Sequence, residues 1–168
     1  TIHSLTYFEV EKSRSAIQKL AKMMRFVLNE EQEDYIALTE EINFIQNYIE
    51  LMRFRLPETI NLNVEIDCSE NDLKIAPMIL LTFIENAFQH GITTTKESEI
   101  ELKIKVNQAI LTLETRNEIV ENKVIHRTKN IGIENTIKRL NIMYTSKFDY
   151  HTKILDHQYY CFLKLDLK

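Results

Sequence analysis

Polar side chains interrupt an apolar stretch at residues 80–92, which read LLTFIENAFQHGI. At about 100° of rotation per residue, Thr82, Asn86 and His90 share one face of a helix, with Glu85 beside them. Asparagine and carboxylate oxygens suit Mg²⁺, which is usually held together with waters and phosphates. The alternative is structural, because Asn86 could cap a neighbouring element and His90 could interact with the C-terminal end of the helix dipole. This helix alone leaves both interpretations open.

The composition limits the classes of partner and setting. The chain has 168 residues, 44% of them hydrophobic, and a net charge of −4. Such a balance is typical of a soluble globular protein and offers no basic footprint, so we expect no direct contact with nucleic acid. Cys68 and Cys161 lie too far apart for ligand spacing, which argues against zinc and favours a reduced cytosolic setting. No apolar run approaches the roughly 18 residues of a membrane span, so any anchor of the parent protein lies outside this sequence.

The shortage of glycine excludes two common phosphate-binding loops. Gly91 and Gly132 are the only glycines in the chain. A GxGxxG fingerprint and a Walker A loop each need several glycines for close backbone approach to phosphates. Each of the two glycines therefore calls for its own explanation.

The first third of the chain has helical periodicity. Apolar residues predict a helix over 8–29, and Thr39 is the expected N-cap of a second helix that stops before Pro57. The polar NEEQED stretch between them makes the pair a hairpin. The second helix carries an apolar stripe at 3-4-3 spacing, formed by Ile42, Ile45, Ile49 and Met52. This stripe could pair with a second copy of the chain or pack on the chain's own core, and the pattern does not decide between them.

Beyond Pro57 the period changes to that of strands. Two-residue alternation predicts strands at 60–67, 99–106, 109–115, 149–156 and 159–167, with Asn107-Gln108 as a hairpin turn. Helices are expected to begin at Ala76-Pro77 and at Gly132. Residues 117–130 are polar and aperiodic, as in a lid or binding loop. The predicted class is α+β, with one mostly antiparallel sheet whose apolar face is covered by helices.

Two motifs in this order carry a family resemblance. IENAFQHG, a strand ending at Asn117, a polar lid and NIGIENTIKRLNIMY together resemble the nucleotide-binding motifs of the GHKL ATPase and histidine kinase superfamily. More narrowly, the chain resembles the catalytic region of LytS/YehU-type sensor histidine kinases. The family's ENAxKHG pattern matches up to Gly91, with Gln89 where lysine is usual, and its GIGLxNxxxRLxxxY pattern matches from Gly132 to Tyr144. NFIQNYIELMRFRL is similar to the segment that ends the family's dimerisation helices.

The resemblance implies a fold and an activity. The fold would be a two-layer α/β sandwich of the Bergerat (GHKL) type, with a mixed, mostly antiparallel sheet, preceded by a helical hairpin. Residues 1–57 would be a helical dimerisation and phosphotransfer remnant, and residues 58–168 the ATP-binding catalytic domain. The whole protein would transfer the γ-phosphoryl group of ATP to a histidine for relay to a response regulator.

The resemblance also assigns roles to residues around the phosphates. Asn86 would hold the Mg²⁺ that bridges the triphosphate, and Glu85 would polarise or orient the reacting group. His90 would line the phosphate side of the pocket. Gly132 would let the phosphates approach a helix N-terminus, where unsatisfied N–H groups and the dipole favour an anion.

Further along, the resemblance is less complete. Asn117 stands where the family commonly has the adenine-binding aspartate of DNGxG, and it offers a weaker, uncharged acceptor. Asn130 stands where a second lid glycine is often found. Asn135 and Arg139 would follow Gly132 at one and two turns, and Arg139 could pair either with a phosphate or with another helix. Two alternatives follow: a degenerate, dimeric signalling scaffold with little or no nucleotide binding, or an unrelated α+β interaction domain.

The expected partners also follow from the family. Its phosphoacceptor histidine sits in a segment resembling NPHFLFN, which is absent here, and His3 aligns just beyond it. We therefore expect this chain to bind ATP without autophosphorylating. The expected partners are a response regulator of the DNA-binding type and a second copy through the N-terminal helices. The chain would be a cytoplasmic domain of a protein attached to the inner or plasma membrane through segments not included here.

Overall fold

A five-stranded mixed sheet forms the centre of the molecule. The computed structural model describes residues 10–30, 33–70, 72–93, 97–119 and 131–168. The strand order is β2-β4-β5-β7-β6, formed by β2 (Ile60–Asp67), β4 (Ser98–Asn107), β5 (Ile110–Glu118), β7 (Gln158–Asp166) and β6 (Phe148–Leu155). β2 pairs with β4 in parallel, and the other three pairings are antiparallel. The predicted α+β class with a mostly antiparallel sheet is confirmed.

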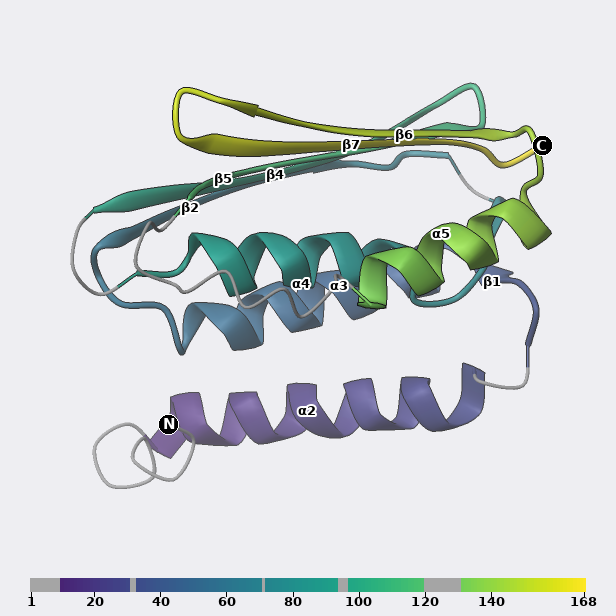
Figure 1. The fold of residues 1–168 in the computed structure, drawn as a ribbon. Helices are drawn as coiled ribbons and strands as arrows, with labels where there is room; N and C mark the ends of the chain where they lie inside the picture. Colours follow the sequence, from purple (N-terminus) through teal and green to yellow (C-terminus); the bar gives the residue numbers. More distant parts are fainter. Residues whose placement is uncertain (1–9, 31–32, 71, 94–96, 120–130) are drawn as a thin grey trace.

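Helices cover one face of this sheet (Figure 1). The helices of this layer are α3 (Leu38–Arg53), α4 (Ile79–Gly91) and α5 (Ile131–Met143). An outer helix, α2 (Val10–Glu30), packs on α3, with the rings of Phe26 and Phe44 stacked 4.5 Å apart. Among the described residues, no element covers the opposite face of the sheet, which explains the alternating pattern of its strands.

The core lies between the sheet and the helices. Alternate residues of β4 point toward the helices and are at most 1% exposed, namely Ile100, Leu102 and Ile104. They meet the fully buried Phe83 and Ile84 of α4. The intervening β4 residues are charged and belong to the open face, where Arg116 of β5 pairs with Glu99 and Glu101.

The apolar stripe of α3 packs on the chain's own core. Ile42, Ile45 and Ile49 are buried in the same cluster as the sheet residues. A short antiparallel pairing of β1 (Ile36–Ala37) with β3 (Lys74–Ile75), which the sequence did not predict, further ties this region to the rest. Of the two interpretations left open, the structure supports packing within one chain for α3. The domain boundary at residue 57 stays a prediction.

Three details of the prediction were wrong, and the first is the start of α4, which lies at Ile79 rather than at Ala76-Pro77. Thr39 is not an N-cap, because α3 begins at Leu38 with Ala37 in the cap position and no side-chain capping bond. The β4–β5 turn is Gln108-Ala109 rather than Asn107-Gln108, since Asn107 pairs with Ile110 and extends the ladder by one residue. Both turn residues have positive φ, 53° and 62°, without any glycine. The expected lid beyond residue 119 and His3 lie outside the described residues.

Gly91 allows α4 to approach the sheet closely. A Cβ added at Gly91 would lie 2.8 Å from Cβ of Asn117 and 2.9 Å from Cγ1 of Ile100. At Gly132, an added Cβ would meet only Cγ2 of Thr82, at an ordinary 3.5 Å. Packing therefore requires glycine at position 91 and not at position 132.

We predict opposite effects on stability when each glycine is replaced by alanine. Gly91→Ala should lower the free energy of unfolding by about 1–3 kcal/mol, because the new methyl group overpacks the contact with Asn117 and Ile100. Gly132→Ala should leave it unchanged or raise it by up to about 1 kcal/mol through better helix propensity. Urea denaturation of the two variants and the wild type measures this, and equal effects would contradict the packing role of Gly91.

Candidate functional site

The polar stripe of α4 lies beside the beginning of α5. The two helices run antiparallel, and Oγ1 of Thr136 donates a hydrogen bond to Oγ1 of Thr82 at 3.0 Å. Gly132 is in contact range of the same threonine. Asn86 lies one turn beyond Thr82 on α4, which places it next to the first turn of α5. The contact that the structure shows is between Gly132 and Thr82, and a shared site of Asn86 and Gly132 stays a prediction.

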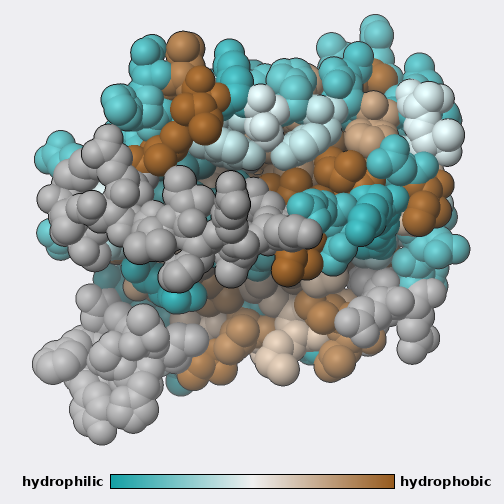
Figure 2. Space-filling view, in the orientation of Figure 1, coloured by the Kyte–Doolittle hydropathy of each residue, from teal (hydrophilic) through white to brown (hydrophobic). Residues whose placement is uncertain are grey.

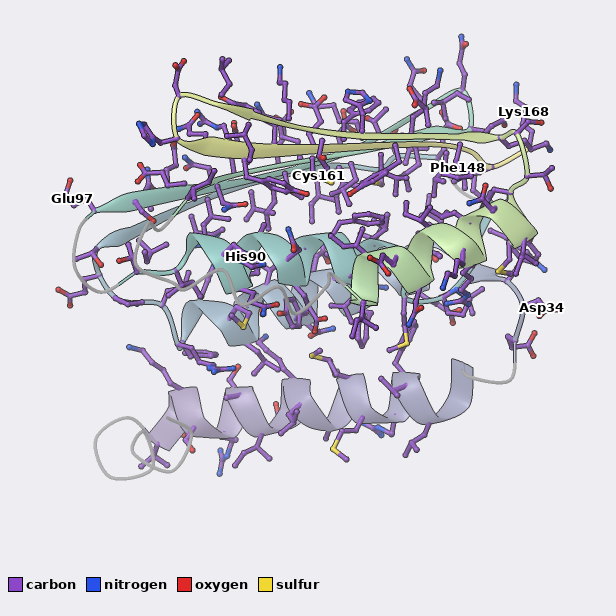
Figure 3. All side chains as sticks on the ribbon, in the orientation of Figure 1. Asp34, His90, Glu97, Phe148, Cys161 and Lys168 are labelled. Carbon is purple, nitrogen blue, oxygen red and sulfur yellow. The ribbon has the colours of Figure 1, made fainter. Side chains whose placement is uncertain are left out.

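The polar residues of α4 differ in exposure and in their neighbours. Asn86 is 8% exposed, whereas Glu85 and His90 are exposed. Figure 3 shows His90 toward the C-terminal end of α4. Partial burial raises the pKa of Glu85 above its usual value. Burial raises the pKa of Tyr48 in α3 to about 12, and the charge of Glu85 adds to this effect. The charge of Glu85 is therefore close enough to α3 to act on Tyr48.

The first turn of α5 provides an open helix N-terminus. Its leading N–H groups have no partners within the helix, and the dipole there favours an anion. Gly132 has an ordinary helical φ and no tight packing contact. Since the fold itself does not require a glycine at this position, its lack of a side chain leaves the backbone accessible to a bound group.

Asn117 carries a buried acceptor that is not satisfied. The residue is 0% exposed, near the end of β5 and directly beneath Gly91. Its Nδ2 donates to the carbonyl of Glu118 at 3.0 Å, so the amide presents Oδ1 on its other side. Oδ1 accepts no hydrogen bond from any residue that the structure describes. A buried acceptor in this state costs about 1–3 kcal/mol, which a ligand N–H group would recover.

Arg139 does not join this group of residues. Its Nη1 donates to the carbonyl of Pro77 at 2.6 Å, just before α4 begins. Pro77 and Asn86 are nine residues apart in the sequence, about 14 Å along a helix axis. The geometry therefore favours the inter-helix role over the phosphate role that the resemblance implied. Asn135, one turn after Gly132, is exposed on α5.

Glu41 is a functional candidate that the sequence interpretation missed. Its side chain is fully buried and reaches the beginning of α4. Oε2 accepts a hydrogen bond from the N–H of Met78 at 2.9 Å, and Oε1 accepts one from Leu80 at 3.2 Å. The sequence does hold a signal for this role, because Glu41 shares a helix face with the apolar residues Leu38 and Ile45, where a carboxylate is expected to be buried.

The open face of the sheet holds a separate depression of about 240 Å³. Its charged groups are largely paired among themselves, as Glu101 is with both Arg116 and Lys103. The ammonium of Lys153 lies 5.0 Å above the ring of Tyr160. This face therefore offers little unsatisfied bonding capacity to a ligand.

The described residues hold neither a metal-binding cluster of acidic, histidine or cysteine side chains nor a membrane-spanning helix. They contain no cluster of three or more histidine, cysteine, aspartate or glutamate side chains able to hold a metal ion. None of the helices in this part of the chain combines the length and the apolar character needed to cross a bilayer.

Known proteins resemble this chain in sequence and in fold. The histidine kinase family model matches residues 1–60. The sensor protein LytS of Oceanobacillus iheyensis is 29% identical over 143 residues, which cover 78% of this chain and 24% of that protein. The histidine kinase domain of the blue-light activated kinase EL346 of Erythrobacter litoralis superposes with a TM-score of 0.58, 11% identity and coverage of 92% and 74%. Full-length ShkA, solved in complex with AMPPNP, superposes with a TM-score of 0.56, 13% identity and coverage of 90% and 35%.

The two kinds of likeness support different statements. At identities of 11% and 13%, the solved structures show the fold, which is that of histidine kinase domains. The sequence relationship is to LytS, of which the chain spans about a quarter. The family model covers residues 1–60, the LytS match covers 78% of the chain, and the superposition on the EL346 kinase domain covers 92% of it. This chain is therefore similar in sequence to LytS-type sensor histidine kinases and has the fold of histidine kinase domains.

Proposed function

We propose that this chain is the ATP-binding catalytic region of a two-component sensor histidine kinase. In the whole protein it would transfer the γ-phosphoryl group of ATP to a histidine, for relay to a response regulator. The observation that carries the proposal is the buried, unsatisfied Oδ1 of Asn117 in the helix-covered face of the sheet. The exocyclic amino group of adenine is a donor of the kind that this acceptor lacks.

The candidate residues would hold the two ends of the nucleotide at different points along α4. Asn117 lies at Gly91, and Asn86 precedes Gly91 by five residues, about 8 Å along the helix axis. The base would bind at Asn117, and the phosphates would extend toward Asn86 and the N–H groups at Gly132. His90 and the exposed Asn135 would line the same site.

Mg²⁺ would bind through Asn86, together with waters and phosphate oxygens, which is a usual arrangement for this ion. When bound, it would neutralise charge on the triphosphate. The chain's own contribution to transfer would be positioning and charge complementarity, because the phosphoryl group needs little covalent assistance. Glu85, whose charge acts on Tyr48 of α3, would orient the acceptor brought by the N-terminal helices.

The known proteins support this assignment. ShkA, which shares the fold, was solved with AMPPNP, an ATP analogue. The LytS relative is a sensor protein, and we infer a response regulator of the DNA-binding type as partner. We also infer that the chain is a cytoplasmic domain of a protein attached to the inner or plasma membrane. The second candidate is a dimeric signalling scaffold with weak nucleotide binding, which the uncharged side chain of Asn117 favours.

The first test is a calorimetric titration of the chain with AMPPNP, with and without Mg²⁺. The wild type should bind in a Mg²⁺-dependent manner, and Asn86→Ala should bind at least about tenfold more weakly, the equivalent of one lost interaction of about 1.4 kcal/mol. Asn141→Ala is the matched control, since Asn141 is exposed at the far end of α5 and bonds only within its helix. Absence of wild-type binding at millimolar AMPPNP would favour the scaffold.

The second test separates function from stability at Asn117. Asn117→Leu keeps a similar volume and removes the unsatisfied acceptor, so the free energy of unfolding should change by less than about 1 kcal/mol or rise. Affinity for AMPPNP should nevertheless fall about tenfold or more. Urea denaturation and calorimetry on the same variant measure the two quantities. A large loss of stability with unchanged affinity would show that Asn117 is only a packing residue.

The exposed face of α2 supports the inferred homodimer. Val10, Ile17 and Met24 recur at intervals of seven residues and are 62%, 53% and 58% exposed. Leu20 and Leu28 extend the same apolar stripe. Figure 2 shows apolar side chains along the lower edge of the molecule, where α2 lies. Heptad spacing of this kind is typical of helices that pair along a common axis.

We predict that charge on this stripe prevents dimerisation. The double variant Ile17→Asp/Met24→Asp should sediment as a monomer at concentrations where the wild type is dimeric, because two buried carboxylates would face their copies. Gln18→Asp, on the polar side of α2, should remain dimeric. Analytical ultracentrifugation distinguishes these outcomes, and a wild type that is monomeric at all concentrations would contradict a dimer formed by α2 alone.

A further inference from the structure

The beginning of α4 is held by a buried carboxylate from α3. The cap residue Met78 has a positive φ of 61° and makes no side-chain capping bond of its own. Glu41 supplies the cap instead, with one carboxylate oxygen on the N–H of Met78 and the other on the N–H of Leu80. A carboxylate at this position also complements the positive end of the helix dipole.

Side chains from α5 hold the residues immediately before α4. Arg139 donates to the carbonyl of Pro77 at 2.6 Å, and the N–H of Ala76 donates to the hydroxyl oxygen of Tyr144, which follows α5, at 2.8 Å. The ring of Tyr35 packs edge-on against Tyr144 at 6.2 Å. Every residue from 76 to 78 is thus bonded to α3 or to the α5 region through its backbone.

The charge on Glu41 changes near neutral pH. Burial raises the pKa of Glu41 to about 7, although its two N–H bonds and the charge of Arg139 oppose this rise. Among the described residues, Tyr144 is a second titratable group whose pKa is affected by the charge of Glu41. Burial raises the pKa of this phenol to about 12, so it stays neutral. The ionised carboxylate accepts both N–H bonds, whereas the protonated group has one oxygen committed as a hydroxyl.

We propose that Glu41 is a positioning residue for the nucleotide site, because it fixes the start of α4 relative to α3 and α5. Asn86 lies on α4 and Gly132 on α5, so a shift of the α4 terminus changes how these two residues are placed relative to each other. Glu41 belongs to α3, on which α2 packs, and so connects the N-terminal helices with the site. This proposal rests on the proposed function, since it concerns the placement of the nucleotide-binding residues.

The test compares Glu41→Gln with Glu40→Gln in AMPPNP affinity at pH 6, 7 and 8, with Mg²⁺. Glutamine imitates the protonated carboxyl group, so Glu41→Gln should match the wild type at pH 6 and bind at least about threefold more weakly at pH 8. Glu40 is the exposed neighbour in the same helical turn, and its variant should follow the wild type throughout. Any pH dependence that the three proteins share, including the titration of AMPPNP itself, cancels in the ratio of affinities.

Stability provides a readout that does not depend on the nucleotide. The folded protein holds the Glu41 proton more tightly than the unfolded chain does, since the pKa rises from 4.5 to about 7. The free energy of unfolding of the wild type, relative to Glu41→Gln, should therefore be highest below about pH 4.5 and fall as the pH rises toward 7.

The outcomes separate the two proposals. Equal affinities of Glu41→Gln and wild type at every pH would overturn the positioning role while leaving the proposed function intact. Failure of the wild type to bind AMPPNP would overturn the proposed function, and with it the role of Glu41 at that site. If Glu41→Gln does not fold, Tyr144→Phe removes the neighbouring bond to Ala76, and unchanged affinity in that variant would also overturn the proposal.

Discussion

The close approach of α4 to the sheet is the constraint on which the rest of the structure depends. With no side chain at Gly91, the helix comes near enough to cover Asn117 and Ile100 completely. The same approach buries Phe83 and Ile84 against the strands. Because the interior is close-packed, a displacement of α4 by even one methyl group must be absorbed by its neighbours on every side. The helix that carries the polar stripe therefore has little freedom of position.

The candidate site is assembled from elements distant in the sequence. α4 contributes Asn86, α5 contributes an open N-terminus at Gly132, and β5 contributes the buried acceptor of Asn117. None of these features is unusual alone, and what distinguishes them is that all three lie around a single helix, α4. An unsatisfied acceptor lowers stability, and a hydrogen-bond donor on a bound ligand would offset that cost at Asn117.

The chain forms its turns and one of its helix caps without the local residues that usually provide them. Both hairpin turns adopt positive φ without glycine, at Gln108-Ala109 and at Asp156-His157. Of the two glycines, Gly91 stands where a side chain would collide with the sheet, whereas Gly132 has room for one. Capping is also achieved at a distance, since α4 receives its cap from Glu41 on another helix. Tertiary contacts here replace local signals that many proteins encode within the element itself.

By itself, the sequence determined the element types and a family resemblance, because periodicity and motif order are local properties of the chain. Strand 60–67 and the apolar face of β7 at Cys161, Leu163 and Leu165 agree with prediction. Only the tertiary structure decided that the α3 stripe packs inward, that Arg139 reaches Pro77, and that Glu41 caps α4. The physical reason is that a side chain's partner depends on which distant surface lies within a few ångströms, and spacing along one helix carries no information about that distance.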